Sequence, residues 1–164
     1  MITDVRPGLG AAYNCCVNQP APFTDNDYCF ACGSKNPLGM QLHFFIERGG
    51  DGSDVLCTRL KPSPHWQGFA GVMHGGLQAT VMDDLMSNFL FRLRHVFVVT
   101  AELKTRFRRP VPLDAELLFT ARETAHDGKV WHIRGECRLA SDSSGAALTT
   151  CEGRFIEIEP PASL

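Results

Sequence analysis

The sequence predicts an α+β domain in which an antiparallel sheet wraps around one long, largely buried helix. Only residues 76–93 carry a convincing helical repeat, whereas strand-like segments separated by turn residues occur both before and after it. Apolar residues surround most of this helix, which suits a helix covered by a sheet. With 164 residues, the chain has the length of one domain with a substantial core.

Residues 1–27 are expected to form an irregular leader, because prolines, glycines and asparagines break any period there. The single domain is then expected over residues 28–164. Its first strand is predicted at residues 41–47, where apolar and aromatic residues gather. The turn sequence GGDG at residues 49–52 leads to a partner strand at residues 55–60.

The predicted helix repeats an apolar residue at every fourth position: Leu77, Val81, Leu85 and Phe89. After it, residues 100–107 alternate apolar and polar side chains with period two, as expected of a strand. Strands are next predicted at residues 116–123 and 129–139, around the hairpin signal Asp127-Gly128. A last strand is predicted at residues 148–159, and the strands after the helix are expected to form a meander.

Composition and charge exclude several classes of function. The formal net charge is −2, so no overall basic field indicates nucleic-acid binding. The chain lacks the run of about eighteen apolar residues that a membrane span needs. Its first residues lack the features of a signal peptide, and seven scattered cysteines make a poor disulfide framework. A cytoplasmic, reducing location is therefore expected.

Cys29 and Cys32 form a Cys-x-x-Cys pair, which raises the question of a metal site. Cys15 and Cys16 offer two more thiolates, but adjacent cysteines rarely chelate one ion comfortably. A thiol-containing loop is the competing interpretation, and no βαβ pattern supports a redox role. Because no histidine pair has metal-binding spacing either, neither a metal nor a cofactor is expected.

The stretch GVMHGGLQATVMDDLM, which begins at Gly71, places His74 and two glycines directly before the helical repeat. The first N–H groups of a helix have no partner within it and lie at its positive end. Gly75 and Gly76 would let a carbonyl oxygen approach these amides without meeting a Cβ, which suits acyl transfer. The alternative is that the glycines only permit close packing of the helix on the sheet. Spacing alone leaves both interpretations open.

Asp83 lies eight residues beyond Gly75, or roughly 12 Å along a helix axis. One carbonyl therefore cannot contact both groups of the same helix. If both serve one reaction, the carboxylate comes from a second copy whose helix runs antiparallel across a twofold axis. A carboxylate in a mostly buried helix is costly without a partner, which favours a functional role over that of a merely polar residue.

These residues also carry a family resemblance. The stretch around His74-Gly75-Gly76 resembles the signature of hotdog-fold acyl-CoA thioesterases of the phenylacetic-acid-pathway type. In that family an acidic residue follows nine positions after the histidine, a position held here by Asp83. Family members also have a Ser or Thr ten residues before a proline, as Thr100 precedes Pro110. The stretch CFACGSKNPLGMQLHF resembles a leader found in a bacterial subset, so that the resemblance covers residues 29–158.

The resemblance implies a hotdog dimer, paired further into a tetramer, that hydrolyses an acyl or aroyl thioester to free acid and CoA. It implies that the Gly75 amide, helped by Gly76, polarises the thioester carbonyl. Asp83 of the other subunit would act as general base on water, or as nucleophile through a mixed anhydride. Thr100 of that same subunit would hold the water or the carboxylate. Coenzyme A enters as part of the substrate, with no separate cofactor.

Further residues are candidates on weaker grounds. His74 is a candidate catalytic residue, although a contact that fixes the loop before the helix is the simpler interpretation. Some relatives have an Asn or Gln aimed at the carbonyl before the glycine turn. Here Gly68 stands at the Asn position, and the adjacent Gln67 is the candidate. Three arginines, Arg106, Arg108 and Arg109, are candidates for the phosphates of CoA, with solvated surface charge as the alternative.

Two rival functions remain beside the hydrolase. A non-catalytic acyl-CoA-binding protein would keep the fold and the helix-start site but turn over no substrate. A hydratase needs an Asp and a His close together before the helix, and residues 65–73 contain no such pair. The acyl group itself depends on a pocket that one sequence does not define.

Overall fold

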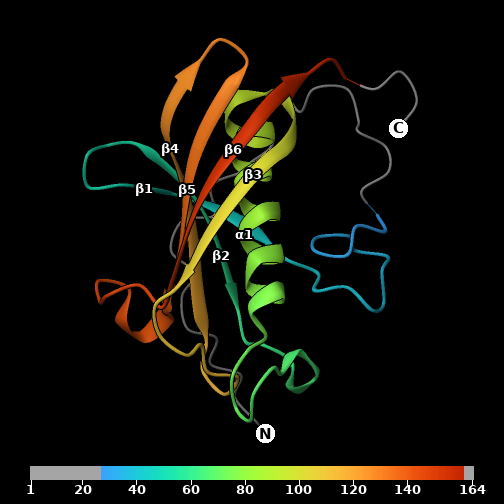
Figure 1. Ribbon diagram of the computed structural model, residues 1–164, viewed down its shortest axis with the longest axis vertical. Coiled ribbons are helices and arrows are strands. Elements are labelled where there is room, and N and C mark those ends of the chain that lie inside the picture. The colour runs from blue at the N-terminus through green and yellow to red at the C-terminus, as the bar shows by residue number, and fades with distance from the viewer. Residues whose placement is uncertain (1–26, 161–164) are drawn as a thin grey trace, which may run out of the picture.

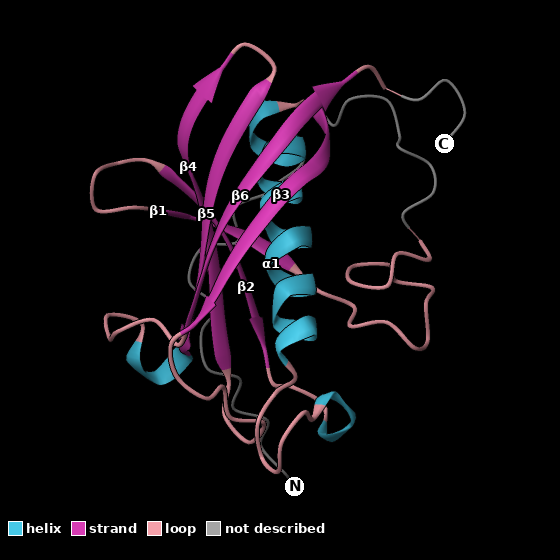
Figure 2. Ribbon diagram, in the orientation of Figure 1, coloured by secondary structure: helices cyan, strands magenta, loops and turns pink. Residues whose placement is uncertain are grey.

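The computed structural model describes residues 27–160, and it has six strands and one long helix (Figures 1 and 2). The predicted leader, residues 1–27, lies almost wholly outside the described residues. The elements are β1 (Phe44–Arg48), β2 (Asp54–Leu60), α1 (Gly75–Phe89), β3 (Phe97–Phe107), β4 (Leu117–Asp127), β5 (Val130–Leu139) and β6 (Thr149–Ile158). Short 3-10 turns occur at Pro64–Trp66 and Ala140–Asp142, and a π-helical turn, Leu90–Arg94, directly follows α1.

The strands form one antiparallel sheet in the order β1-β2-β4-β5-β6-β3, and α1 lies along one face of it (Figure 2). This is the hotdog fold, and the predicted α+β class is confirmed. The hairpin predicted at Asp127-Gly128 is also confirmed, since Asp127 pairs with Val130 and Gly128 has a φ of 55°. Its left-handed backbone is one that glycine adopts without strain.

The expected meander is correct only for β4, β5 and β6. β3 does not pair with β4, the next strand in the chain, but crosses to the far edge and pairs with β6. The reason is the helix, which intervenes between β2 and β3 and carries the chain past the centre of the sheet (Figure 1). β3 consequently becomes an edge strand that runs back beside α1.

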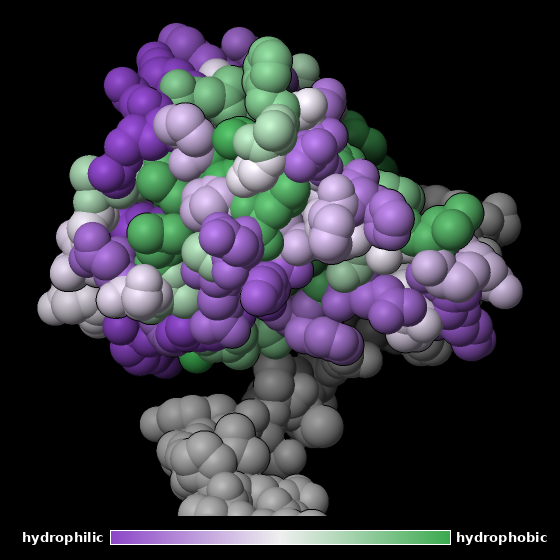
Figure 3. Space-filling view, turned by 90° about the horizontal axis from the view of Figure 1, so that it is seen from below, coloured by the Kyte–Doolittle hydropathy of each residue, from purple (hydrophilic) through white to green (hydrophobic). Residues whose placement is uncertain are grey.

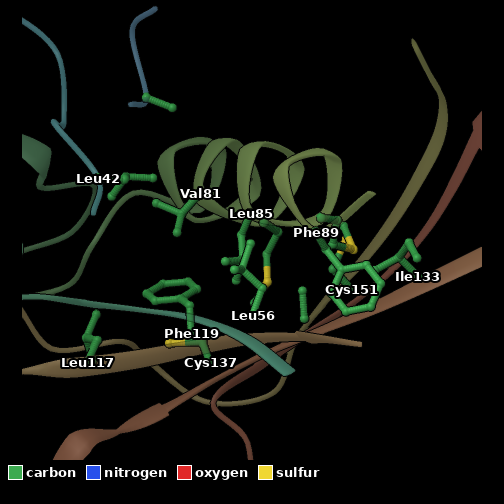
Figure 4. Packing of buried hydrophobic residues seen from close by; sticks show 14 of the residues in the cluster. Leu42, Leu56, Val81, Leu85, Phe89, Leu117, Phe119, Ile133, Cys137 and Cys151 are labelled. Carbon is green, nitrogen blue, oxygen red and sulfur yellow. The ribbon is translucent and has the colours of Figure 1, made fainter. Parts of the chain in front are cut away.

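The core forms where the apolar stripe of α1 meets the sheet. Val81, Leu85 and Phe89 are fully buried and point from the helix toward strand residues that include Leu56 and Phe119 (Figure 4). Burying a side chain of this size contributes roughly 1.5–3 kcal/mol to stability. The predicted repeat therefore identified the buried face of the helix correctly.

Two features fix the position of the helix on the sheet. At Gly135 of β5, an added Cβ would lie 2.7 Å from Sδ of Met82, so this glycine permits the close approach of α1. Near the helix start, the buried Gln78 donates from Nε2 to the carbonyl of Met73 (2.9 Å). Its Oε1 accepts from the hydroxyl of Thr149 at 2.6 Å. These contacts tie the beginning of α1 to the beginning of β6.

The helical stretch ends close to the predicted boundary, but its last turn is π-helical rather than α-helical. His95 then takes a left-handed conformation (φ 57°) and closes the turn. None of the helices in residues 27–160 is long and apolar enough to cross a membrane.

Candidate functional site

The start of α1 exposes one free amide. His74 caps the helix, with its Nδ1 accepting from the N–H of Gly76 at 3.0 Å. Its carbonyl accepts from Leu77 and Gln78, both at 3.1 Å. The Gly75 N–H has no acceptor among the residues that the structure describes. Because the Gly76 amide already donates to His74, the expectation that it helps Gly75 at a carbonyl is not supported by this geometry.

Gly75 lies against the last residue of β3. A Cβ added at Gly75 would come within 3.1 Å of Cζ of Phe107, so a side chain there would crowd the aromatic ring. Phe107 is itself 56% exposed. The glycine therefore leaves the helix start open next to an edge strand.

Asp83 and Thr100, predicted to act together, are in direct contact. The Thr100 hydroxyl donates to Oδ1 of Asp83 at 2.7 Å, which joins the middle of α1 to β3. The residues are 17 positions apart in the sequence, and the return of β3 along the helix brings them together. The hydroxyl orients a carboxylate that remains partly accessible to solvent.

The two halves of the site lie along the same edge of the molecule, but they do not meet within one chain. Gly75 contacts Phe107 at one end of β3, and Asp83 contacts Thr100 near the other end. Asp83 lies eight positions beyond Gly75 in the helix, which corresponds to roughly 12 Å along its axis. In the described sheet, β3 pairs with β6 on one side only.

The loop before α1 is held by its own polar contacts. Oε1 of Gln67 accepts from the N–H of Gly71 at 3.0 Å, and Gly71 has a φ of 74°. Gly68 packs against His74, whose Cα would lie 3.2 Å from an added Cβ. The contacts of Gln67 thus shape the loop, and its Nε2 has no acceptor among the described residues.

The predicted arginines differ in their partners. Arg106 forms an ion pair with Glu152 (2.8 Å), and Arg109 donates to the carbonyl of Ala146. The guanidinium of Arg108 has no ion-pair or hydrogen-bond partner within residues 27–160. Since Arg108 directly follows Phe107, it is the arginine beside the helix start that remains available to an anion.

A pocket of about 190 Å³ lies between the second half of α1 and the beginning of β3. Its lining residues are Asp84, Ser87, Asn88, Phe91, Val96, Phe97 and Val98. Val98 is two positions before Thr100, so the pocket lies close to the Asp83–Thr100 pair. Aromatic and aliphatic side chains on one wall make it suitable for an apolar group.

Asp84 turns away from Asp83 and faces the Cys-x-x-Cys loop. Its Oδ1 lies 3.7 Å from Sγ of Cys29 and 3.5 Å from Sγ of Cys32. Burial raises the pKa of Asp84, although the contacts with the two cysteines partly oppose this. Burial also raises the pKa of Cys32, as does the neighbouring Asp84 charge. The Cys-x-x-Cys pair is visible in the sequence, but its contact with Asp84 is not, because 52 residues separate Asp84 from Cys32.

The end of the molecule at which α1 begins is seen directly in Figure 3, where hydrophobic and hydrophilic residues are interspersed. The exposed apolar side chains of the described chain include Phe69, in the loop before α1, and Val99 and Phe107, in β3. Apolar groups therefore occur both beside the free amide and along the edge strand.

Comparisons with known proteins agree on one family. The model of the thioesterase superfamily matches residues 70–146, which span the loop before α1, the helix and strands β3 to β5. The protein named acyl-coenzyme A thioesterase THEM4 from Bos taurus is 26% identical over 134 residues. This match covers 82% of the present chain and 53% of that protein. The chain thus spans about half the length of the curated relatives it matches.

Solved structures give the same result for the fold. A crystal structure described as a thioesterase superfamily protein has a TM-score of 0.65 and 27% identity, covering 77% of this chain and 61% of that one. A Bacillus halodurans protein crystallised with CoA has a TM-score of 0.57 and 21% identity, and the match covers 71% of this chain and 74% of that one. Both align over most of the described hotdog fold.

Proposed function

We propose that this chain, which has the hotdog fold and resembles the thioesterase superfamily over residues 70–146, hydrolyses acyl-CoA thioesters. The observation that carries the proposal is the pairing of two features along β3. One is the free Gly75 amide at the start of α1, and the other is the Asp83 carboxylate held by Thr100. The relatives named acyl-coenzyme A thioesterase, and the CoA in a related crystal structure, support this substrate class.

The Gly75 amide is suited to polarise a thioester carbonyl. It lies at the positive end of a 15-residue helix and donates to no described acceptor. Negative charge that develops on the carbonyl oxygen during attack is stabilised by such a preorganised donor. His74 contributes by accepting from the Gly76 N–H, which fixes the first turn, while the Gly75 N–H has no acceptor among the described residues.

The carboxylate is supplied by a second copy of the chain. β3 is an eleven-residue edge strand, and unpaired strand edges readily pair with another chain. Val99 (48% exposed) and Phe107 (56% exposed) give this edge an apolar character. Antiparallel pairing of two β3 strands about a point between Leu103 and Lys104 brings Thr100 of one copy opposite Phe107 of the other. The Asp83–Thr100 pair of one copy then faces the Gly75 amide of its partner.

In the proposed reaction, Asp83 accepts a proton from water as the water oxygen attacks the thioester carbon. The carbon–sulfur bond then breaks, and the proton passes to the departing sulfur to give free CoA and the carboxylic acid. Asp83 as nucleophile through a mixed anhydride gives the same products after a second attack by water. In either route, the Thr100 hydroxyl donates to Oδ1 and keeps the Asp83 carboxylate oriented.

The two ends of the substrate have separate candidate sites. We assign a phosphate of CoA to Arg108, which lies beside the helix start and has no described partner. We assign the acyl group to the pocket between α1 and β3, whose wall at Val98 is close to Thr100. Arg106 and Arg109 contribute positive charge nearby while bound to Glu152 and Ala146.

The direct test is thiol release from a panel of short, long and aromatic acyl-CoAs with the parent protein and with Asp83→Asn. The amide keeps the size of the side chain, but it neither accepts a proton as a base nor attacks as a carboxylate. The expected loss of kcat is at least about 100-fold. Activity of Asp83→Asn within a few-fold of the parent would reject Asp83 as the catalytic carboxylate. Tight binding of acyl-CoA without thiol release by the parent protein would instead support the non-catalytic alternative.

A further inference from the structure

We propose that Cys29, Cys32 and Asp84 form a zinc site that fastens the segment before β1 onto helix α1. The ligand atoms of these three residues lie within 4.8 Å of one another. They come from two parts of the chain that are more than 50 residues apart. The site uses neither Gly75 nor the Asp83–Thr100 pair, and it goes beyond the proposed hydrolysis; Asp84 also lines the pocket between α1 and β3.

The distances agree with coordination of one tetrahedral ion. With zinc–sulfur bonds of about 2.3 Å and zinc–oxygen bonds of about 2.0 Å, a sulfur and an oxygen ligand lie about 3.5 Å apart. The measured separations of Asp84 Oδ1 from the two sulfurs are 3.7 Å and 3.5 Å. An ion between the three atoms therefore requires only small movements of the side chains.

The Asp84 carboxylate gives an independent indication of a missing partner. Its Oδ2 is buried and has no hydrogen-bond partner among the described residues. Its Oδ1 has only the two thiols, which are weak donors. A buried carboxylate oxygen without a strong donor is costly, and a bound cation would remove that cost. Asn88 and Ser87 contact the backbone carbonyl of Asp84 rather than its side chain.

The loop that carries the cysteines is a tight turn held by backbone hydrogen bonds. The N–H of Gly33 donates to the carbonyl of Cys29 at 2.9 Å, which folds the loop tightly around Cys32. A Cβ at Gly33 would lie 2.5 Å from the Cys29 nitrogen, so only glycine permits this turn. Backbone hydrogen bonds from Met40 to Phe30 and from Leu42 to Ala31 hold the loop in place. Both thiols are thereby presented on the same side, toward α1.

Two thiolates and one carboxylate select zinc among the common cellular cations, because thiolates are soft ligands and zinc accepts both sulfur and oxygen. Binding displaces the two thiol protons into solvent, and water fills the fourth position. The segment 27–42, which runs beside α1 in Figure 1, is then joined to the helix one residue beyond Asp83. The metal would stabilise this segment and the middle of α1 without entering the reaction.

The experiment measures zinc in the full chain, purified without chelators and then equilibrated with zinc and desalted. We expect about one zinc per chain, in keeping with a single three-residue site. The double variant Cys29→Ser/Cys32→Ser and the single variant Asp84→Asn should lose most of it. Two controls should keep the parent zinc content: Asp83→Asn, which changes the adjacent carboxylate, and Cys57→Ala, which removes a buried thiol elsewhere.

Cobalt provides a readout that does not depend on folded variants. Added to the metal-free parent chain, Co²⁺ should give thiolate-to-metal charge-transfer absorption and saturate at about one equivalent per chain. Substoichiometric zinc in the loaded parent protein, or equal zinc in the parent and the double variant, would overturn the proposal. So would a Cys29–Cys32 disulfide, found by mass spectrometry in the freshly purified chain. Because metal content is measured separately from thiol release, failure here leaves the hydrolase proposal untouched, and the reverse also holds.

Discussion

The hydroxyl of Thr100, on the edge strand β3, donates a hydrogen bond of 2.7 Å to Oδ1 of Asp83, in the middle of helix α1. This contact orients the only carboxylate that the proposed mechanism uses. It also locates that carboxylate at the edge of the sheet, where a second copy of the chain can reach it.

Thr100→Val should lower kcat while leaving the fold intact, since valine has nearly the shape of threonine but no hydroxyl. A hydrogen bond to a charged group is worth about 1.5 kcal/mol or more, which corresponds to about a 10-fold loss of activity. Steady-state thiol release measures the effect. Thr100→Ser keeps the hydroxyl and is the matched control, expected to remain within a few-fold of the parent. Equal losses in the valine and serine variants would contradict the orienting role.

Mixing two inactive variants should restore activity if each site combines groups from two chains. Asp83→Asn lacks the carboxylate, and Gly75→Ala crowds the free amide and the Phe107 ring. After the two are unfolded together and refolded, heterodimers contain one intact site, giving about a quarter of the parent activity per chain. Each variant refolded alone is the control. No recovery from a mixture shown to contain heterodimers would rule out a site shared between chains.

Substitutions at His74 separate a capping role from a chemical one. His74→Ala removes the Nδ1 acceptor of the Gly76 N–H and should cost about 1 kcal/mol in the free energy of unfolding. His74→Asn restores a good capping oxygen and should recover most of that stability, as measured by urea denaturation. If capping is the whole contribution, the asparagine variant also keeps its activity within a few-fold. A large loss of kcat in a fully stable His74→Asn variant would instead assign His74 a chemical role.

Val98→Phe should change the preference among acyl groups. Its larger side chain fills part of the pocket of about 190 Å³ that we assign to the acyl group. We expect kcat/KM to fall at least about 10-fold for long or aromatic acyl-CoAs, because an overfilled pocket forces strain of about 1–3 kcal/mol. Acetyl-CoA, which needs little of the pocket, serves as the internal control. An equal fall in kcat/KM for all acyl-chain lengths would show that this pocket does not hold the acyl group.

Much of the fold could be predicted because its signals are local. The apolar residues at every fourth position of α1 identified the buried face of the helix, and the Asp127-Gly128 signal identified the β4–β5 turn. The pairing of β3 with β6 could not be predicted in this way. It depends on where the helix delivers the chain, and local periodicity carries no information about that path.

The candidate site could likewise be predicted only where its signals are local. The glycines at the start of α1, and Asp83 nine residues after His74, can be recognised as a motif in the sequence. The sequence does not show which glycine amide is free to bind a ligand. That depends on the capping contact of His74, which occupies the Gly76 N–H and leaves the Gly75 N–H without a described acceptor. Asp84 directly follows Asp83 in the sequence. In the structure, the two carboxylates point to different partners, Thr100 and the cysteine pair.

The sequence by itself determined the α+β class, the buried face of the helix, and the positions of Gly75 and Asp83 along it. Each of these follows from the spacing of residues within single elements. Only the tertiary structure decided that β3 is an open edge, that Thr100 reaches Asp83, and that Asp84 meets Cys29 and Cys32. Each of these contacts joins segments that are distant in the chain and that come together when the helix packs against the sheet. That packing depends on the free energy of the whole core, which cannot be read from any short stretch of residues.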